Sequence, residues 1–328
     1  MKKLSEVLTL QLESDGVDDR LSLIEAASMM AGELLPPVYI ISHKRANDVR
    51  TLRTIPGLKG HAALVVAEAE VLDYIDHAGD VDLLTIPAGF GGHDIGVGRA
   101  RQFCLEHARD NDLDHILILD DDLEQLSVLY SIGGGKVSHA RKAISAGWED
   151  DFQMGIMVLF AALMEEAYSS HPEAVTGAPQ CNNANRTPAS ASLRWQVNAG
   201  NTPAQFQSWH VPRFFELCGG LNLEEFNFHG DDIGATADII GRGGSIVNIP
   251  SIIGQYADYE TESVIRTPET APVLRLAEHE ALMRMAIAPY IKTRFDFLDR
   301  PQWHAMNWRT LKKDGVVKGD VRLWTDGV

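Results

Sequence analysis

The sequence predicts an α/β fold with a mostly parallel central sheet flanked by helices. Four short, continuous apolar runs lie at residues 38–41, 62–67, 82–86 and 115–119, and polar residues follow each of them. A segment with the apolar spacing of a helix separates the third run from the fourth. Short apolar strands that alternate with helices are typical of parallel sheets covered on both faces, and such sheets bind ligands at the carboxyl ends of their strands.

The remaining elements follow in chain order. Residues 1–35 are expected to form a helical N-terminal extension that ends at two consecutive prolines. The helix before the fourth strand has one apolar face, which consists of Val97, Ala100, Cys104, Leu105 and Ala108. A long helix is expected at residues 149–169, and a further strand follows it. Residues 131–143 are rich in glycine and basic residues, which favours a loop.

The composition is that of a globular protein of the cytoplasm. Apolar residues make up 45% of the chain and charged residues 23%. The longest apolar run, residues 154–164, is about half as long as a membrane span, so no membrane partner is expected. The N-terminus lacks the apolar core of a secretory signal. Cys104, Cys181 and Cys218 are widely spaced and odd in number, which indicates reduced thiols.

The net charge of −17 argues against broad neutralisation of nucleic-acid phosphates. The charge is nevertheless uneven, because residues 290–328 contain eight Lys and Arg against five Asp, with three tryptophans between them. This basic C-terminal tail has two interpretations, a contact with a polyanion or a solvated cap. The sequence leaves both of them open.

An acidic triplet, Asp120-Asp121-Asp122, follows the fourth strand. Three consecutive carboxylates repel one another unless a cation shares the site. Mn²⁺ and Mg²⁺ prefer carboxylate oxygens and can hold a diphosphate at the same time. Because alternate residues of an extended chain point the same way, Asp120 and Asp122 are the predicted metal pair, and Asp121 is expected to point away from them.

Other phosphate and metal sites fit this region less well. An ATPase would need a GxxxxGK[ST] loop before the acidic strand, and the sequence has none. A calcium loop that begins at Asp120 would need glycine at its sixth position, which is Gln125. No correctly spaced GxGxxG motif follows the first strand. A solvated acidic strand end, without any function, remains an alternative for the triplet alone.

A second acidic motif lies far downstream, between Gly219 and Pro250. Asp231 and Asp232 precede a predicted helix, which a glycine pair ends before the next strand. Carboxylates at a helix start are often only caps, so this motif by itself does not indicate catalysis.

Taken in order, the motifs resemble the GT-A glycosyltransferases, particularly the large inverting family 2, over residues 37–256. The resemblance rests on the strand that ends in LDDD, the segment GGLNLEEF from Gly219, the segment GDD from Gly230, and the helix opening GRARQ from Gly98. Residues 38–56 and the helix after Gly98 are also similar to the TET-associated glycosyltransferases. This small phage-borne group is thought to glycosylate 5-hydroxymethylpyrimidines in DNA.

The resemblance implies a GT-A domain at residues 36–260, with a helical, basic tail at 261–328. It implies a UDP-sugar as the donor and Mn²⁺ or Mg²⁺ as the cofactor. Asp232 corresponds to the general base, and Asp231 stands where the family has Glu. The implied donor-binding residues are Ser42, Arg45, Glu68, Arg101 and Asp120. The implied metal ligands are Asp120, Asp122 and His304.

The narrower resemblance implies 5-hydroxymethylcytosine in phage DNA as the acceptor, and the host cytoplasm as the location. DNA phosphates would then contact the basic tail and the arginines of the predicted crevice, which are Arg45, Arg50, Arg53, Arg99 and Arg101. Two alternatives stay open. One is a cytosolic glycosyltransferase that acts on a small molecule, a protein or a glycan, and the other is a nucleotidyltransferase. The sequence does not indicate the oligomeric state.

Overall fold

The chain was analysed as a computed structural model, whose described residues are 17–79, 81–90, 96–131, 137–139, 149–181, 193–197, 205–219, 235–236, 239–240 and 242–256. Three of the predicted functional residues, Asp231, Asp232 and His304, lie outside these ranges, as does the predicted C-terminal tail.

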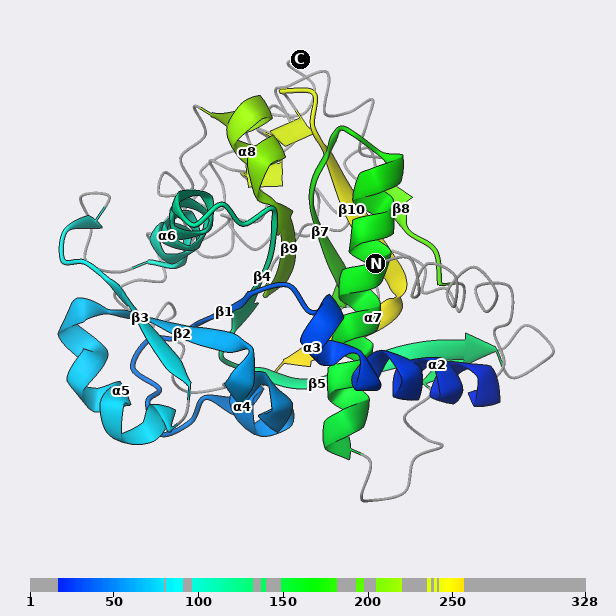
Figure 1. Ribbon diagram of the computed structural model, residues 1–328, viewed down its shortest axis with the longest axis horizontal. Helices are drawn as coiled ribbons and strands as arrows, with labels where there is room; N and C mark the ends of the chain where they lie inside the picture. Colours follow the sequence, from blue (N-terminus) through cyan, green and yellow to red (C-terminus); the bar gives the residue numbers. More distant parts are fainter. Residues whose placement is uncertain are drawn as a thin grey trace, which may run out of the picture.

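Within the described residues, the strands form a ten-stranded sheet with the order β3-β2-β1-β4-β9-β7-β10-β5-β6, and β8 pairs with β10 (Figure 1). The strands are Val38–Ile41 (β1), Ala62–Ala67 (β2), Asp82–Ile86 (β3), His115–Asp120 (β4), Leu123–Ser131 (β5), Val137–His139 (β6), Ala174–Cys181 (β7), Gln196–Val197 (β8), Phe206–His210 (β9) and Ser245–Tyr256 (β10).

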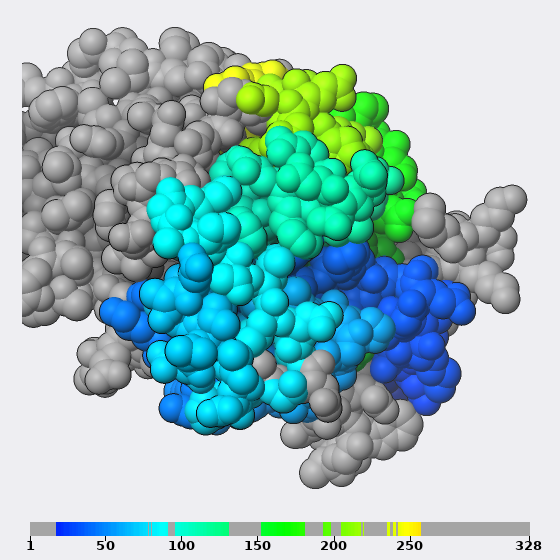
Figure 2. All heavy atoms as spheres, turned by 60° about the vertical axis from the view of Figure 1, so that its left-hand side comes forward, coloured from blue at the N-terminus to red at the C-terminus, as the bar shows by residue number. Residues whose placement is uncertain are grey.

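The helices connect these strands and cover the sheet. They are Val17–Met29 (α2), Ala31–Leu34 (α3), Arg50–Thr54 (α4), Val71–Ala78 (α5), Val97–Asp110 (α6), Glu149–Ser170 (α7) and Val211–Cys218 (α8), with 3-10 turns at Pro56–Gly60 (η1) and Glu68–Glu70 (η2). Figure 2 shows α5, α6 and α8 following one another across one side of the molecule, from the bottom to the top of the view.

The α/β class predicted from the sequence is confirmed. Strands β3, β2, β1 and β4 are all parallel, as are β7 and β10. The four predicted apolar runs form β1 to β4, and the predicted helices before and after β4 form α6 and α7. The sequence prediction missed β5, β6, β8 and β9, and it expected a loop at residues 131–143, where β6 pairs antiparallel with β5. Strand β9 pairs antiparallel with both β4 and β7, so it separates the two parallel parts of the sheet.

Apolar residues of the central strands alternate between two buried clusters. In β1, Val38 and Ile40 belong to one cluster and Tyr39 belongs to the other. The first cluster includes residues of α2, α4 and α7, while the second includes residues of α6 and α8. Because successive side chains of a strand point to opposite faces, the two clusters are the cores on the two faces of the sheet.

The longest apolar run of the sequence lies inside α7. Its residues are almost all buried, and the helix packs against α2 and several strands. None of the helices among the described residues combines the length and the apolar character that crossing a membrane requires.

The strand register brings the carboxyl ends of the central strands together. Ile41, the last residue of β1, pairs with Val65 of β2 and with Asp120 of β4. The segments that follow β1 and β4 therefore start side by side at one edge of the sheet. This is the edge at which the sequence predicted the ligand site.

Candidate active site

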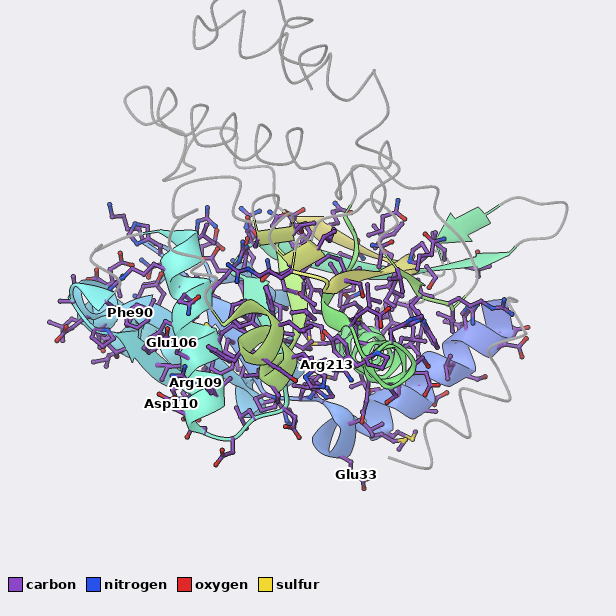
Figure 3. The ribbon with its side chains drawn as sticks, turned by 90° about the horizontal axis from the view of Figure 1, so that it is seen from above. Glu33, Phe90, Glu106, Arg109, Asp110 and Arg213 are labelled. Carbon is purple, nitrogen blue, oxygen red and sulfur yellow. The ribbon has the colours of Figure 1, made fainter. Side chains whose placement is uncertain are left out.

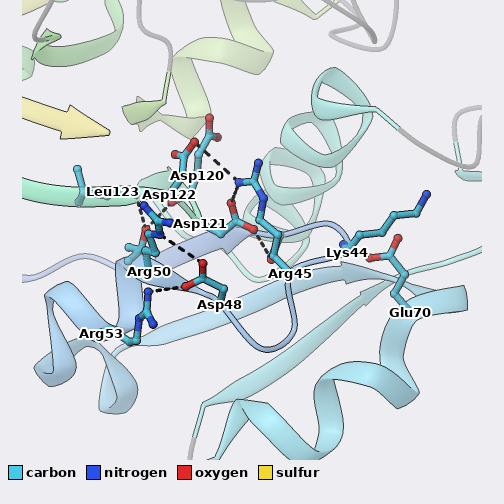
Figure 4. A network of polar contacts seen from close by, with 12 residues as sticks. Lys44, Arg45, Asp48, Arg50, Arg53, Glu70, Asp120, Asp121, Asp122 and Leu123 are labelled. Atoms are coloured by element: carbon cyan, nitrogen blue, oxygen red, sulfur yellow. Dashed lines mark hydrogen bonds and ion pairs between the residues drawn. The ribbon is translucent and has the colours of Figure 1, made fainter. Parts of the chain in front are cut away.

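The acidic triplet lies where β4 ends and the chain turns into β5. Asp120 is the last residue of β4, Asp121 and Asp122 form the turn, and β5 begins at Leu123. Figure 4 shows the carboxylates of Asp120 and Asp122 next to each other, while the carboxylate of Asp121 is directed to the loop after β1. The predicted alternation of the three side chains is thus observed.

Asp121 joins the turn to the loop after β1, residues 42–49, which is called the β1 loop below. Its Oδ2 accepts a hydrogen bond from Ser42 Oγ at 2.5 Å, and its Oδ1 lies 2.5 Å from Arg45 Nη1. The hydroxyl of Tyr74 lies 2.7 Å from Ser42 Oγ and accepts a hydrogen bond from the Arg45 backbone N–H at 3.0 Å. Ser42, Arg45 and Tyr74 all lie in segments far from the triplet in the sequence. Asp121 therefore fixes two of the predicted donor-binding residues, Ser42 and Arg45, at this edge of the sheet.

Two arginines offset part of the charge of the triplet. Arg101 Nη2 lies 3.2 Å from Asp120 Oδ1, and only 4% of the Arg101 side chain is exposed. The Nη1 atom of Arg45 lies 3.8 Å from Asp122 Oδ2, much farther than from Asp121. Three carboxylates thus lie beside two guanidinium groups. The distance from Asp122 to its arginine is the longest of the three.

Burial raises the pKa values of all three aspartates. Burial, together with the neighbouring charges of Asp120 and Asp121, raises the pKa of Asp122 to about 7. Burial likewise raises the pKa of Asp120 to about 6, although Arg101 opposes the change. In addition, Asp122 Oδ1 is buried and has no hydrogen-bond partner among the described residues. A divalent cation beside Asp120 and Asp122 would relieve both features, so the residues present fit a metal site.

The described residues do not form a complete metal site by themselves. No group of three or more His, Cys, Asp and Glu side chains in the described part of the chain is arranged to hold a metal ion. Asp120 and Asp122 could supply two ligands. The third predicted ligand, His304, lies outside the described residues.

Glu68, a predicted donor-binding residue, contacts a different part of this edge. Its exposed carboxylate accepts a hydrogen bond from the Ala88 backbone N–H at 2.8 Å, in the turn after β3. The buried carboxylate of Glu70 reaches the β1 loop instead, where it pairs with His43 Nδ1 and accepts a hydrogen bond from the Lys44 N–H at 2.9 Å. Sequence reasoning missed Glu70, which lies only two residues from Glu68, because nothing local separates a buried glutamate from an exposed one.

The structure corrects one part of the predicted DNA surface. Arg99 and Arg101 are both buried. Arg99 donates hydrogen bonds to the backbone carbonyls of Phe90, at 2.8 Å, and Pro87, at 2.6 Å, so it fastens the turn after β3 to α6. Both arginines therefore make contacts inside the fold and are not presented to a DNA backbone. Of the predicted set, Arg53 is the most exposed, with 65% of its side chain accessible, and it pairs with Asp48.

The paired carboxylates and arginines lie at the carboxyl ends of the parallel strands, which is where α/β sheets of this kind bind their ligands. The chemistry follows from the family to which the sequence is related. Residues 36–170 match the family model described as TET-Associated Glycosyltransferase. The resemblance inferred from the motifs is thus confirmed, and the chain is a glycosyltransferase. The matched range includes the triplet, Ser42, Arg45 and Arg101, and it ends before Asp231.

Comparison with solved structures gives distant similarities. Glucosyl-3-phosphoglycerate synthase from Mycobacterium tuberculosis, in complex with Mn²⁺, UDP and phosphoglyceric acid, has a TM-score of 0.42 and 12% identity over 80% of this chain and 82% of that chain. GalNAc-T7 with UDP, GalNAc and Mn²⁺ has a TM-score of 0.38 and 14% identity over 80% and 54% of the two chains. Mannosyl-3-phosphoglycerate synthase from Rubrobacter xylanophilus has a TM-score of 0.41 and 10% identity over 90% and 79%. No match was found among the curated proteins.

Proposed function

We propose that the protein transfers a sugar from a UDP-sugar to an acceptor hydroxyl, with a divalent metal ion at the acidic triplet. The observation that carries the proposal is the arrangement of Asp120 and Asp122. Both carboxylates are adjacent, both have raised pKa values, and Asp122 Oδ1 has no hydrogen-bond partner among the described residues. A cation that also holds a diphosphate is the simplest ligand for such a pair.

In this proposal Asp120 and Asp122 hold Mn²⁺ or Mg²⁺, and His304 is the third protein ligand. The bound ion would stabilise the negative charge of the departing diphosphate. Arg101 keeps Asp120 in place through its 3.2 Å contact. It also adds positive charge where the diphosphate would lie, as does the amino-terminal end of α6, to which it belongs.

The nucleoside of the donor is proposed to bind over the β1 loop. Ser42 and Arg45 are fixed there by Asp121, and Glu68 lies at the end of the neighbouring strand β2. A loop that is held before the ligand arrives loses little freedom on binding, so these contacts favour donor affinity. His43 lies on the same loop, and its pair with Glu70 of η2 adds a second polar group beside it.

The general base is proposed to be Asp232, with Asp231 beside it. The base would take the proton of the acceptor hydroxyl as its oxygen attacks the anomeric carbon, which gives inversion at that carbon. Asp232→Asn should abolish transfer and leave UDP binding intact. Unchanged turnover in this variant would rule out Asp232 as the base, and the Asp231→Asn variant would show whether the neighbouring carboxylate has that role instead.

The proposed acceptor is 5-hydroxymethylcytosine in phage DNA, and the proposed location is the host cytoplasm. The match to the TET-associated family supports this acceptor. Among the described residues that follow β1, Lys44 and Arg53 are basic and exposed, and Arg53 pairs with Asp48. The hydroxymethyl group lies in the major groove or on an extruded base. In either case the group has to reach the edge of the sheet that carries the acidic triplet.

Turnover with defined donors and acceptors tests the function. The protein is incubated with Mn²⁺ and either UDP-glucose or UDP-N-acetylglucosamine, with a duplex that contains 5-hydroxymethylcytosine, and the release of UDP is measured. A matched duplex with cytosine is the control. Release that depends on the modified duplex supports the proposed acceptor. Equal release with both duplexes would remove DNA as the acceptor and favour a small molecule, protein or glycan. If neither UDP-sugar is turned over or bound, the proposal that a UDP-sugar is the donor is wrong.

A further inference from the structure

Thr51 binds the backbone of the acidic turn at three points. Its hydroxyl donates a hydrogen bond to the carbonyl oxygen of Asp120 at 2.7 Å and accepts one from the N–H of Leu123 at 3.1 Å. Its own backbone N–H donates to the carbonyl oxygen of Asp121 at 3.1 Å. The side chain of Thr51 is completely buried. A single residue of α4 thus holds both ends and the middle of the segment that carries the three carboxylates.

Helix α4 is itself firmly attached to the fold. Leu52, which follows Thr51, and Ile55, which follows the helix, are buried in the first apolar cluster. The N–H of Ile55 donates a hydrogen bond to the Thr51 carbonyl at 3.0 Å. One turn later, Thr54 donates through its hydroxyl to the carbonyl of Leu123 at 2.9 Å. The three bonds of Thr51 therefore start from a rigid element, which is a requirement for positioning a ligand group accurately.

The acidic turn needs such a support. Asp120, Asp121 and Asp122 repel one another, and the two arginines nearby contact their side chains. Strands β4 and β5, which the turn connects, do not pair with each other, so they share no ladder of hydrogen bonds that would hold it. The backbone bonds to Thr51 keep the turn in one conformation while its side chains are driven apart.

We infer that Thr51 is a positioning residue, whose hydroxyl holds Asp120 and Asp122 in the geometry that binds the metal ion and diphosphate. The inference rests on the proposed function to the extent that those two carboxylates hold the ion. Thr51 acts through the backbone and contacts neither the ion nor the substrate. Its removal should therefore weaken metal binding without removing any ligand.

Three variants separate this role from ordinary packing. Thr51→Val keeps the shape of the side chain and removes the hydroxyl, while Thr51→Ser keeps the hydroxyl and removes the methyl group. Thr54→Val is the matched control, because it removes a hydroxyl of the same helix that contacts only the start of β5. Binding of Mn²⁺ in the presence of UDP is measured by calorimetry, and the Mn²⁺ concentration for half-maximal turnover is measured in parallel.

The expected result is a loss of Mn²⁺ affinity of about tenfold or more in Thr51→Val, and affinity close to that of the unmodified protein in Thr51→Ser and Thr54→Val. Saturating Mn²⁺ should restore much of the turnover of Thr51→Val, since its ligands are intact. Equal affinity in Thr51→Val and Thr54→Val would overturn the inference and leave Thr51 as a packing residue.

A measurement on the unmodified chain covers the case in which Thr51→Val does not fold. Amide hydrogen exchange of the segment around Leu123 is measured in metal-free buffer that contains EDTA. Slow exchange is expected, because Thr51 already holds this N–H, and fast exchange would overturn the inference. If the unmodified protein binds no Mn²⁺ with UDP, the proposed function fails, whereas the exchange result still decides whether Thr51 holds the turn.

Discussion

Asp122 carries the least compensated charge of the acidic triplet. Among the described residues, the cation that contacts it is Arg45, whose Nη1 is 3.8 Å away and already lies 2.5 Å from Asp121. Its Oδ1 has no hydrogen-bond partner among the described residues, and its pKa is raised to about 7 by burial and by the adjacent carboxylates. A side chain that is costly to keep ionised and useful to a cation is typical of a functional position.

Asp122→Asn should therefore have opposite effects on activity and stability. Sugar transfer is expected to fall by about 100-fold or more, because a proposed metal ligand is lost. The free energy of unfolding without metal, measured by denaturant titration at pH 8, should rise by on the order of 1 kcal/mol, since the repulsion disappears.

Glu124→Gln is the matched control for this prediction. Glu124 lies two residues further on and forms a partly exposed ion pair with Arg50 at 2.7 Å. Its replacement should change the free energy of unfolding by less than about 0.5 kcal/mol and leave transfer intact. An Asp122→Asn protein that is fully active, or that is clearly less stable than the original, would contradict the assignment.

At the scale of residues, the sequence predicted what depends on neighbours in the chain. Strand alternation correctly placed Asp120 and Asp122 on one side and Asp121 on the other. It could not predict that Tyr74 and Thr51 would hold the site, because their partners are 32 and 72 residues away in the sequence. Such contacts follow from the strand order, and no local pattern marks them.

The contact between α2 and α7 depends on one glycine. A Cβ atom at Gly155 of α7 would overlap with the backbone carbonyl oxygen of Ile24 in α2. Gly155→Ala should therefore destabilise the protein by about 1–3 kcal/mol, although alanine is the better helix former. Gly32→Ala in α3 is the control, because no atom lies within 4 Å of its Cβ position. Thermal unfolding of both variants checks the prediction, and equal stability would contradict the close approach of the two helices.

The junction of β9 and α8 gives a prediction about pH. His210 accepts a hydrogen bond from the Arg213 N–H at 3.4 Å, and the rings of His115 and Tyr168 lie 4.8 Å and 5.4 Å away. Arg213 itself lies between α8 and α7 (Figure 3), where its Nη1 donates to the His171 carbonyl at 3.1 Å. Burial, aided by the charge of Arg213, lowers the pKa of His210 to about 4.

The folded state therefore disfavours protonation of His210, whereas the unfolded chain takes up the proton near its ordinary pKa of about 6.5. The stability that His210 contributes is present above pH 6.5 and is lost as the pH falls toward 4. His210→Asn keeps an acceptor for the helix start and does not titrate. Denaturant titrations should show the original protein losing stability relative to this variant between pH 7 and pH 5, and a constant difference would contradict the prediction.

Among the elements, the composition of a strand determines whether the sequence predicts it. Runs such as HILIL are continuous and apolar, and they were predicted correctly because both faces of their strands are buried. Strand β9, FQSWH, is equally buried, but it has polar Gln207 and Ser208 in its middle. Ser208 is accommodated because its hydroxyl and carbonyl meet Tyr168 and Thr176. The sequence alone does not reveal those partners.

The charge of the whole molecule limits how it can recognise DNA. With a net charge of −17, the protein cannot rely on general attraction to phosphates. We predict that it binds a duplex of ordinary bases with a dissociation constant weaker than about 10⁻⁴ M at physiological salt, so that selection depends on the modified base. Fluorescence anisotropy with labelled duplexes measures this. Micromolar affinity for the unmodified duplex would contradict the prediction.

The proposed site at the carboxyl end of β4 would bind a nucleoside diphosphate through a divalent ion. Calorimetric titration of UDP into the full chain tests it most directly, once with Mn²⁺ and once with EDTA. We expect binding with Mn²⁺ only, and loss of that binding in both Asp120→Asn and Asp122→Asn. Equal binding of UDP in EDTA, or unchanged binding in those two variants, would contradict it.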